Sequence, residues 1–400
     1  MKKQEQEEDM IVAGVMSGTS ADGINVALVR ISGSHAPGRL NFELLGHAEH
    51  SYSKKVRATV LAAMNATRAS VADLARLNFL LGELYSDAVL STERQFRLKA
   101  DLVGCHGQTL YHQGEPQRFL GRKVAATWQT GEGAIIAARV GAPVISDFRP
   151  ADMASGGHGA PLVPFLDHIL FRDARLGRIV QNIGGIANLT AIPAGAATND
   201  LIAFDTGPGN MVIDGVTQRL FNQPFDRNGR IAASGKILDN VLHEILKRNF
   251  FRKKSPKTAG REEFGREFVI EFVRTCGRSA KSDVVATATA LTARSIADAL
   301  RRFVLAVPGS PKNLVRGHFE EMILSGGGAK NSTLVAILTG ELAALGLRLR
   351  FSDEFGLPSA AKEAVAFAVL AHETWHNRTS NVPSATGANR PAVLGKISYC

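Results

Sequence analysis

The first fifty residues alternate short apolar runs with turns, a pattern typical of β-strands. The runs cover residues 10–16, 24–31 and 41–50, and turns rich in glycine and serine at 18–23 and 33–38 separate them. The spacing then changes, because Leu74, Leu77 and Leu81 recur every three or four positions. That period predicts a long amphipathic helix after the meander of strands.

The same succession of strands and helices occurs twice along the chain. In the first half, helices are predicted over 53–66, 70–96 and 131–141, and strands over 100–112, which runs into a loop, and 143–148. In the second half, strands are predicted on both sides of Gly184 and Gly185, at the start of 201–220, at the start of 319–342 and within 347–358. Helices complete 201–220 and 319–342 and fill 236–274, 282–303 and 359–376, and the polar tail from Asn377 is predicted to be irregular. This alternation predicts two α/β domains of similar plan with a cleft between them, where small-molecule sites tend to lie.

Length and composition fit a globular protein and exclude several classes. The chain has 400 residues, 45% hydrophobic and 21% charged, which is enough for two domains with a core each. The formal net charge is +10, but the chain contains no long lysine or arginine run, so we expect no nucleic-acid partner. The densest basic cluster, residues 250–257, is interpreted as a solvated loop or a source of attraction for an anionic small substrate, with a polyanion patch as the alternative.

Cysteine usage and hydropathy predict a cytoplasmic protein. Cys105, Cys276 and Cys400 are far apart and form no CxxC pair, which indicates a reducing compartment. The polar start MKKQEQEED is not followed by the apolar core of a signal peptide. No segment has the roughly 20 uninterrupted apolar residues that span a membrane, so we expect no membrane partner.

Three glycine-rich turns next to predicted strands are the candidate sites of chemistry. They read MSGTSADG at 16–23, NIGGIAN at 182–188 and SGGGAKN at 325–331. Each alone is compatible with a plain hairpin or with a loop that holds phosphate through backbone N–H groups and hydroxyls. No G-x-x-x-x-G-K-[ST] sequence occurs, Val212 stands where a dinucleotide fingerprint needs glycine, and no nucleophile elbow surrounds Ser17. By motif, the chain is neither a P-loop enzyme nor a standard dinucleotide-binding protein.

Stretches spread in order over nearly the whole chain resemble the anhydro-N-acetylmuramic acid kinase family. They include GVMSGTSADG at 14–23, CHGQTLYH at 105–112, DFRPADMASGGHGAPLVPFLD at 147–167, FDTGPGNMVID at 204–214 and PKTAGREEF at 256–264. The resemblance implies an α/β, two-lobed actin-like ATPase fold, ribonuclease H-like in each lobe, with an interdomain cleft. It also implies the reaction: ATP and water open 1,6-anhydro-N-acetylmuramic acid, and O6 is phosphorylated, in peptidoglycan recycling.

The resemblance also implies the domain organisation and the partners. A first lobe is expected over residues 10–146 and a second over 147–358, and helix 359–376 is expected to pack back on the first lobe. The partners would be ATP and a small amino-sugar substrate. A homodimer is compatible with the family, although no motif of the chain indicates one.

The matching turns imply an ATP site, with Mg²⁺ as the accompanying cofactor. The ATP-binding residues would be Gly18, Thr19, Ser20, Ala21, Asp22, Gly23, Ile24, Asn25, Gly184, Gly185, Gly326, Gly327, Gly328 and Asn331. Asp22 is compatible with two roles: it could reach Mg²⁺ through water, or it could cap the turn. The phosphates would lie on the first turns, and the nucleoside on the last one.

Asp205 is the predicted catalytic base, because it ends the apolar strand LIAFD and is followed by TGPGN, with a turn aspartate as the alternative. The expected substrate-binding residues are His106, Gln108, Arg149, Asp152 and Glu363. Arg149 suits the lactyl carboxylate of a muramic sugar and Asp152 a hydroxyl or amide, unless the two pair with each other. His106 and Gln108 could instead brace a loop, and Glu363 could stabilise a helix N-terminus.

Three positions depart from the family pattern and leave alternatives open. Asn25 stands where the family usually has aspartate, His158 where it has glutamine, and WQTGEG at 128–133 where it has a QIG sequence. The change at 128–133 is expected to alter the shape of the sugar pocket, and Asn25 brings no negative charge for a charge-dependent role at its position. A kinase of the same fold for another amino sugar, and a nucleotide-dependent sensor without turnover, remain alternatives.

Overall fold

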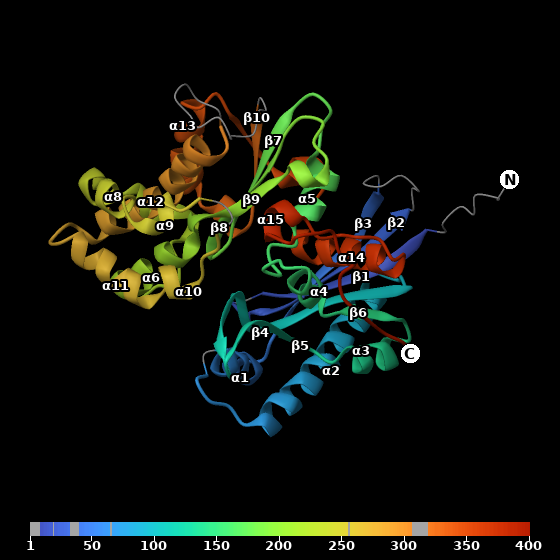
Figure 1. Ribbon diagram of the computed structural model, residues 1–400. Coiled ribbons are helices and arrows are strands. Elements are labelled where there is room, and N and C mark those ends of the chain that lie inside the picture. Colours follow the sequence, from blue (N-terminus) through green and yellow to red (C-terminus); the bar gives the residue numbers. More distant parts are fainter. Residues whose placement is uncertain (1–8, 19, 33–39, 65, 255–256, 306–318) are drawn as a thin grey trace. The chain divides into compact units, whose positions relative to one another are not determined.

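The computed structural model describes residues 9–18, 20–32, 40–64, 66–254, 257–305 and 319–400. The chain divides into two compact units (Figure 1). Unit 1 comprises Met1–Ile169 and Ala360–Cys400, and unit 2 comprises Leu170–Ser359. No helix in the described part of the chain is long and apolar enough to cross a membrane.

Unit 1 is built on a mixed sheet with strand order β12-β6-β4-β1-β2-β3, to which β5 adds by pairing with β4. The strands are β1 (Met10–Ser17), β2 (Gly23–Ser32), β3 (Asn41–Ser51), β4 (Leu102–Phe119), β5 (Arg122–Thr130), β6 (Val144–Ser146) and β12 (Lys396–Ser398). β1, β2 and β3 form an antiparallel meander, and β4 runs parallel to β1 and to β6. The helices are α1 (Lys54–Met64), α2 (Val71–Phe96), α3 (Gly133–Val140), α4 (Phe148–Ala154), α5 (Pro164–Phe171), α14 (Lys362–Trp375) and α15 (Pro383–Thr386).

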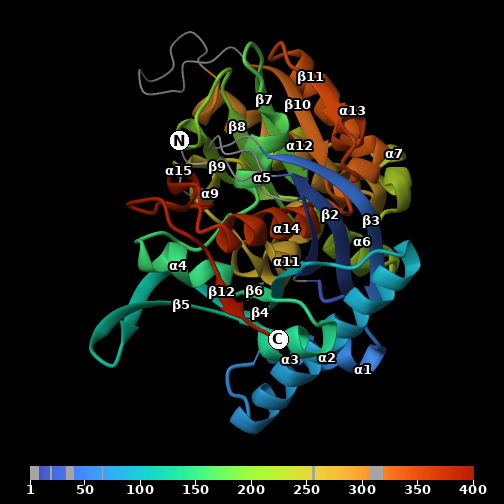
Figure 2. The same cartoon turned by 90° about the vertical axis from the view of Figure 1, so that its right-hand side faces the viewer.

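Helices cover both faces of the unit 1 sheet. On one face, α2 and α3 lie side by side (Figure 2), and Leu81, Tyr85 and Ile136 pack in a core with Val15 and other strand residues. On the other face, α14 lies directly on β1 and β4. A Cβ at Gly14 would be 1.8 Å from the carbonyl oxygen of Ala364, so only glycine allows this approach. The apolar faces of the predicted helix 70–96 and helix 359–376 are therefore buried against opposite faces of one sheet.

Unit 2 repeats the plan, with strand order β11-β10-β7-β8-β9. Its strands are β7 (Gly177–Ile183), β8 (Ile186–Ile192), β9 (Ile202–Pro208), β10 (Phe319–Ser325) and β11 (Arg348–Phe351). β7, β8 and β9 form the antiparallel meander, β10 is parallel to β7, and β11 is parallel to β10. The two sheets thus share one arrangement. In each unit, the three-stranded meander has its first strand in the middle of the sheet, and two further strands, parallel to that first strand, extend the sheet beyond it.

The helices of unit 2 gather around α12 (Lys281–Phe303), whose middle part is mostly buried. The others are α6 (Asn210–Phe221), α7 (Arg230–Ala233), α8 (Asp239–Ile245), α9 (Asn249–Arg252), α10 (Arg261–Phe264), α11 (Arg266–Thr275) and α13 (Ser332–Ala343). α12 contacts α6, α7, α8, α13 and β9, so it connects the sheet to the outer helices. The prediction of an α/β protein built from two similar halves is confirmed.

Several elements differ from the sequence-based expectation. β4 continues to Phe119 and forms a long hairpin with β5, where a loop was predicted after residue 112. β6 ends at Ser146, and Phe148 begins α4 rather than ending a strand. β9 extends three residues beyond Asp205, which therefore lies inside the strand and not at its end. The hairpin was missed because its outer part is exposed and polar on both sides, so no alternation of burial marks it.

The domain boundary and the C-terminal tail also differ from the expectation. The first boundary falls after Ile169 rather than at residue 146, because residues 147–169 pack with the end of the chain. Asp152, fully buried, accepts hydrogen bonds from Asn381 Nδ2 and Thr386 Oγ1, both at 2.7 Å. The tail expected to be irregular contains α15 and β12, and β12 pairs with β6 at the edge of the unit 1 sheet. α14 contacts β1, β2 and β4, so this helix belongs to unit 1.

Candidate active site

Asp205 lies in β9 of unit 2, where its carboxyl is partly buried and held by a separate loop segment. The backbone N–H of Ala259 donates to Asp205 Oδ2 at 2.7 Å, and the backbone N–H of Asp205 donates to the carbonyl oxygen of Lys257 at 3.0 Å. Desolvation raises the pKa of Asp205 to about 7, and Glu262 adds to this rise, whereas the Ala259 N–H and Lys257 oppose it. A carboxyl whose pKa lies near neutrality accepts and returns protons efficiently at neutral pH.

Lys257 is a residue near this carboxyl that sequence reasoning missed. The basic cluster 250–257 was interpreted as a solvated loop or attracting surface, and Arg252, Lys253 and Lys254 are indeed exposed. Lys257 is only 3% exposed, so the interpretation is wrong for this residue. The two phenylalanines that begin the cluster were the available signal, because Phe250 and Phe251 are buried in the core of unit 2.

The glycines of the unit 2 turns divide into those that the fold requires and those that it does not. A Cβ at Gly326 would be 2.6 Å from Asn182 Oδ1, and one at Gly328 would be 2.4 Å from Ile183 Cγ2, so close packing explains both. At Gly184, Gly185 and Gly327 the nearest atoms lie at 3.6, 3.4 and 3.4 Å, which is ordinary contact distance. Packing does not require glycine at these three positions, and their backbone is open to close approach by a ligand.

The loop at Gly184 and Gly185 is joined to the start of α6 by backbone hydrogen bonds. The N–H groups of Gly209 and Asn210 donate to the carbonyl oxygens of Gly185 and Gly184 at 2.9 and 2.8 Å. Asn331 is the N-cap of α13, and its Oδ1 accepts from the N–H of Leu334 at 3.0 Å. The structure therefore brings the predicted phosphate loop and the start of α6 together, and it leaves Asn331 engaged in capping a helix.

The first turn of unit 1 connects β1 to β2. A Cβ at Gly18 would meet only Ser20 Oγ, at 3.9 Å, whereas one at Gly23 would be 2.3 Å from the carbonyl oxygen of His50. Gly23 thus serves the pairing of β2 with β3, and Gly18 faces open space. Ala21 is buried with a φ of 51°, Ile24 is buried within β2, and Thr19 lies outside the described residues.

Asp22 at the same turn has a partner in the protein. Its Oδ1 accepts from Arg57 Nε at 3.1 Å, and the side chain is largely exposed. In the described residues, no three His, Cys, Asp or Glu side chains form a group that could hold a metal ion.

Gln108 braces the turn. Its Oε1 accepts from Ser17 Oγ at 2.8 Å, and its Nε2 donates to the carbonyl oxygen of Gly18 at 3.2 Å. The side chain is fully buried. Of the two roles left open for Gln108, the contacts in unit 1 match loop bracing.

His106, within β4, pairs with Arg149 in the first turn of α4, and the histidine is buried whereas the arginine is partly buried. His106 Nδ1 lies 2.8 Å from the carbonyl oxygen of Gly107 and so donates to it, which leaves Nε2 as an acceptor. Arg149 donates to that Nε2 from Nε at 3.1 Å and from Nη2 at 2.9 Å, and from Nη1 to the Gly159 carbonyl at 2.8 Å. Desolvation and the neighbouring guanidinium lower the pKa of His106 well below its usual range, so the ring is neutral.

Arg149 remains a cation in this setting. Desolvation lowers its pKa to about 10, and Glu363 and Asp152 oppose that shift. Glu363 lies in the first turn of α14 with its side chain open to solvent, although desolvation raises its pKa and Lys362 and Arg149 act against the rise. A fixed guanidinium beside an accessible carboxylate can bind a ligand that carries both an acid and a hydrogen-bond donor.

Asp152 is bound on both carboxylate oxygens by groups of the protein. Besides the bonds from the C-terminal tail, its Oδ2 accepts from the N–H of Gly159 at 2.8 Å. No hydrogen bond joins it to Arg149 in the described residues, so the alternative of an internal pair is not observed either. Its carboxylate, fully buried, instead joins loop 156–159 to the tail, and that loop supplies the carbonyl that holds Arg149.

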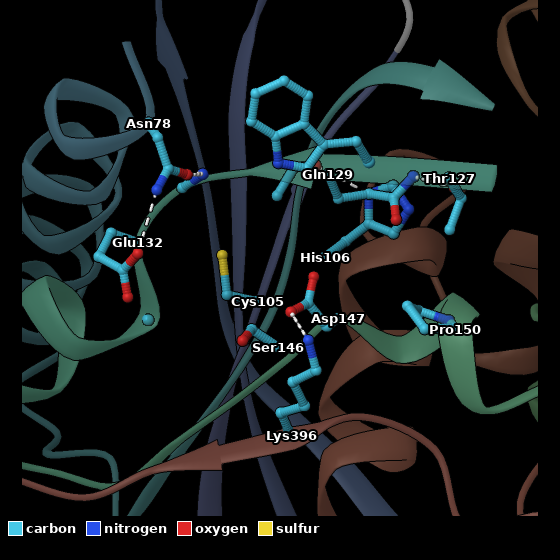
Figure 3. Close-up of a pocket in the computed structure, with 14 residues that line it drawn as sticks. Asn78, Cys105, His106, Thr127, Gln129, Glu132, Ser146, Asp147, Pro150 and Lys396 are labelled. Carbon is cyan, nitrogen blue, oxygen red and sulfur yellow. Dashed lines mark hydrogen bonds and ion pairs between the residues drawn. The ribbon is translucent and has the colours of Figure 1, made fainter. Parts of the chain in front are cut away.

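A pocket of about 280 Å³ opens in unit 1 next to His106 (Figure 3). Its lining comprises Asn78, Cys105, His106, Gly107, Thr127, Trp128, Gln129, Gly131, Glu132, Gly133, Ser146, Asp147, Pro150 and Lys396. Figure 3 shows Asn78 bonded to Glu132 and Lys396 paired with Asp147, at 3.0 and 2.9 Å. The departing sequence at 128–133 thus forms one wall of this pocket.

The other two departures lie at different places in unit 1. Asn25 Oδ1 lies 3.0 Å from His47 Nε2, which connects β2 to β3. Desolvation lowers the pKa of His47, which favours the neutral ring that a neutral asparagine can accompany. His158 Nε2 is 3.7 Å from Glu115 Oε1, beside the β4–β5 hairpin.

The two α/β units share one strand order, and the hairpin turn near the start of each contains a glycine that packing does not require, Gly18 in unit 1 and Gly184 in unit 2. The fold is therefore that of an α/β protein in which one plan occurs twice. The family described as anhydro-N-acetylmuramic acid kinase matches residues 10–400, and the chain belongs to this family. An anhydro-N-acetylmuramic acid kinase of Bacillus cereus is 43% identical over 393 residues, covering 98% of this chain and 99% of the relative. One of Bacillus thuringiensis subsp. konkukian is 42% identical over the same length and coverage.

Solved structures show a more distant similarity. The (R)-2-hydroxyglutaryl-CoA dehydratase component A of Acidaminococcus fermentans is 13% identical with a TM-score of 0.42, covering 91% of this chain and 98% of that chain. The ROK hexokinase from Thermus thermophilus is 14% identical with a TM-score of 0.35, covering 89% and 98%.

Proposed function

We propose that the protein is a kinase that uses ATP and water to convert 1,6-anhydro-N-acetylmuramic acid into N-acetylmuramic acid 6-phosphate and ADP. Membership of the family supports the substrate and the reaction. The single observation that supports the chemistry is Asp205, whose pKa near 7 suits a general base at neutral pH. Such an enzyme would serve the recycling of peptidoglycan.

In the proposed reaction, Asp205 takes a proton from a water molecule as the water oxygen attacks the anomeric carbon. The bond from that carbon to O6 breaks, and its electron pair forms the new bond from O6 to the γ-phosphorus of ATP. The bond between that phosphorus and the bridging oxygen breaks, and ADP leaves. O6 is the leaving group of one step and the nucleophile of the other, so no second base is needed to deprotonate it.

The remaining residues would bind and orient the reactants. Arg149, fixed by His106, suits the lactyl carboxylate of the sugar, and Glu363 suits a hydroxyl or amide donor. Backbone N–H groups at Gly18 and Gly185 suit the phosphates, because packing does not occupy the space beside these glycines. The N–H of Gly184 donates to the carbonyl oxygen of Ile186 at 3.2 Å, so Gly184 would contribute close backbone approach rather than a donor. ATP would be taken as its magnesium complex, in which the metal neutralises phosphate charge.

The proposal also covers where the protein acts and how it assembles. Cys105 and Cys276 are buried and unpaired, and Cys400 is exposed and unpaired, which supports the expected reducing environment of the cytoplasm. The homodimer stays a prediction.

A coupled ADP-release assay with and without 1,6-anhydro-N-acetylmuramic acid tests the function. We expect ADP release that depends on the sugar, and a product that incorporates one oxygen from ¹⁸O-labelled water at the anomeric carbon. ADP release with N-acetylmuramic acid and without incorporation would favour a kinase for another amino sugar, the alternative that the changed wall at 128–133 keeps open. Nucleotide binding without any turnover would contradict the proposal and favour a sensor.

A further inference from the structure

Lys257 is a buried cation in unit 2 that the proposed reaction does not use directly. Its neighbours along the chain, Lys253 and Lys254, are exposed, whereas Lys257 is 3% exposed. Its Nζ lies 4.6 Å from the ring centre of Phe250, 5.0 Å from that of Phe303 and 5.5 Å from that of Phe204. The ammonium also donates to the carbonyl oxygen of Phe250 at 3.3 Å. Three aromatic rings and one carbonyl thus form a cage around a single positive charge.

The backbone of Lys257 and the backbone of Ala259 both bind Asp205. The carbonyl of Lys257 accepts from the N–H of Asp205, and the N–H of Ala259 donates to the carboxylate, at 3.0 and 2.7 Å. Phe204, which contributes to the cage, directly precedes Asp205 in β9. The caged side chain therefore fixes the same three-residue segment, 257–259, that is hydrogen-bonded to Asp205.

We propose that Lys257 is a positioning residue for the base: its caged ammonium holds segment 257–259 against Asp205 and keeps that carboxyl ionised and ready to accept a proton. The inference deepens the proposed function and rests on it for the role of Asp205. Segment 257–259 supplies the geometry through two backbone hydrogen bonds, and the ammonium supplies a positive charge where water is scarce.

The charges around Asp205 and Lys257 agree with this role of the ammonium. Lys257 acts to lower the pKa of Asp205, and Glu262 acts to raise it. Desolvation lowers the pKa of Lys257 to about 8, Asp205 and Asp298 act to raise it, and Arg302 and Lys253 act to lower it further. Without the ammonium, the carboxyl would keep its desolvation and the repulsion from Glu262, so it would hold its proton more tightly.

A purely structural side chain at this position would not need a charge. Burying an ammonium costs free energy that methionine, with a similar length and no charge, would avoid in the same aromatic cage. We therefore expect Lys257→Met to fold with a melting temperature close to that of the wild type. Its defect should appear in the titration of Asp205 and not in the stability of unit 2.

The test compares Lys257→Met and Lys257→Arg with the wild type, and Lys254→Met serves as the matched control at an exposed lysine three positions away. The carboxyl carbons of aspartate are labelled with carbon-13, and the Asp205 signal is assigned by its loss in Asp205→Asn. For Lys257→Met, we expect the midpoint of the Asp205 titration to rise by about one pH unit or more, since an opposite charge at close range shifts a carboxyl by roughly that much. In Lys257→Arg and Lys254→Met the midpoint should stay near that of the wild type.

The pH profile of kcat gives the second readout. Lys257→Met should lose about fivefold in kcat at pH 7, because a rise of one unit from a pKa of about 7 lowers the ionised fraction from about one half to about one tenth. Most of this loss should be recovered at higher pH. An unchanged Asp205 midpoint, or a loss of kcat that is equal at every pH, would overturn the proposal. If Lys257→Met does not fold, Lys257→Gln removes the charge while retaining a donor for the carbonyl of Phe250.

The two proposals fail in distinguishable ways. A wild-type protein without sugar-dependent ADP release would contradict the proposed function, whereas the carbon-13 titration would still report whether Lys257 acts on Asp205.

Discussion

One ring nitrogen of His106 accepts two hydrogen bonds from the guanidinium of Arg149, at 3.1 Å from Nε and 2.9 Å from Nη2. The ring can do this only as a neutral tautomer with its proton on Nδ1, because an arginine has no acceptor. The ring is further held against Phe367 of α14, with 4.5 Å between ring centres. Arg149 is therefore oriented by a histidine that is itself fixed on two sides.

Replacing His106 should weaken sugar binding more than the chemical step. In His106→Leu the guanidinium loses a buried acceptor, a change that costs about 1–3 kcal/mol, and we expect the KM for the sugar to rise roughly tenfold or more. His106→Gln, which keeps an acceptor, should restore part of the loss. Steady-state kinetics check this, with His243→Ala at an exposed position of α8 as the control. A fall in kcat with an unchanged KM would contradict the role of His106 as the partner of a substrate-binding arginine.

Removing the ionisable group of Asp205 should stop turnover and leave the fold intact. Asp205→Asn keeps an oxygen that can accept from the N–H of Ala259 but cannot take a proton from water. Loss of a general base typically costs about 10² to 10⁴ in rate. ADP release with sugar measures the effect, and Asp200→Asn, an exposed aspartate of the same unit, is the control. More than about a tenth of wild-type activity would refute the assignment.

The raised pKa of Asp205 also predicts how stability changes with pH. The pKa of Asp205 is about 7 in the folded protein, whereas the ordinary value of 3.8 applies to the unfolded chain. The folded state therefore binds this proton more tightly than the unfolded state. The contribution of Asp205 to the free energy of unfolding is therefore complete below about pH 4 and is lost as the pH rises through about 7. Thermal unfolding at about pH 5 and about pH 8 should therefore show a larger loss of melting temperature in the wild type than in Asp205→Asn. Equal losses in the two proteins would show that the carboxyl is not desolvated as the structure indicates.

A side chain at Gly18 should affect ATP and not the fold. Because a Cβ at this position meets nothing closer than 3.9 Å, Gly18→Val should keep its melting temperature. The β-branched side chain would block close approach of a phosphate to the backbone, so calorimetric titration should show weaker ATP binding and unchanged sugar binding. Gly23→Val provides the contrast, since its Cβ would be 2.3 Å from the carbonyl oxygen of His50 and the fold should suffer. An equal loss of affinity for ATP and for the sugar in Gly18→Val would show that the turn is a plain hairpin without a phosphate-binding role.

The buried ion pair between Lys362 and Asp167 should matter far more to stability than an exposed pair in the same unit. Lys362 Nζ lies 2.7 Å from Asp167 Oδ1, and both side chains are almost completely buried. Breaking such a pair from one side typically costs about 3–5 kcal/mol. Lys362→Met should therefore lower the melting temperature of the protein strongly. Lys396→Met, which breaks the more exposed pair with Asp147, should cost about 1 kcal/mol or less. Similar melting temperatures for the two variants would contradict the buried pair's contribution.

Local patterns in the sequence were sufficient for the two meanders and the long helices. The alternation in residues 10–50 and the helical period at Leu74, Leu77 and Leu81 depend on neighbours within a few positions, and the structure has strands and a helix there. Glycine turns next to strands pointed to the loops at Gly18 and Gly184 for the same reason. Periodicity of this kind reports which face of an element is buried, and this information is local.

Contacts between distant parts of the chain had to come from the tertiary structure. Asp152 and Asn381 are 229 positions apart, yet their hydrogen bond gives order to a tail that is polar and irregular by pattern. The orientation of Arg149 depends on His106, 43 positions earlier on another element. Lys257 is one of several basic residues in a row, and only the aromatic rings that surround it distinguish it from its exposed neighbours. A residue's type states what bonds it can make, but its burial and its partners depend on which other segments the fold brings beside it, and those segments are not its neighbours in sequence.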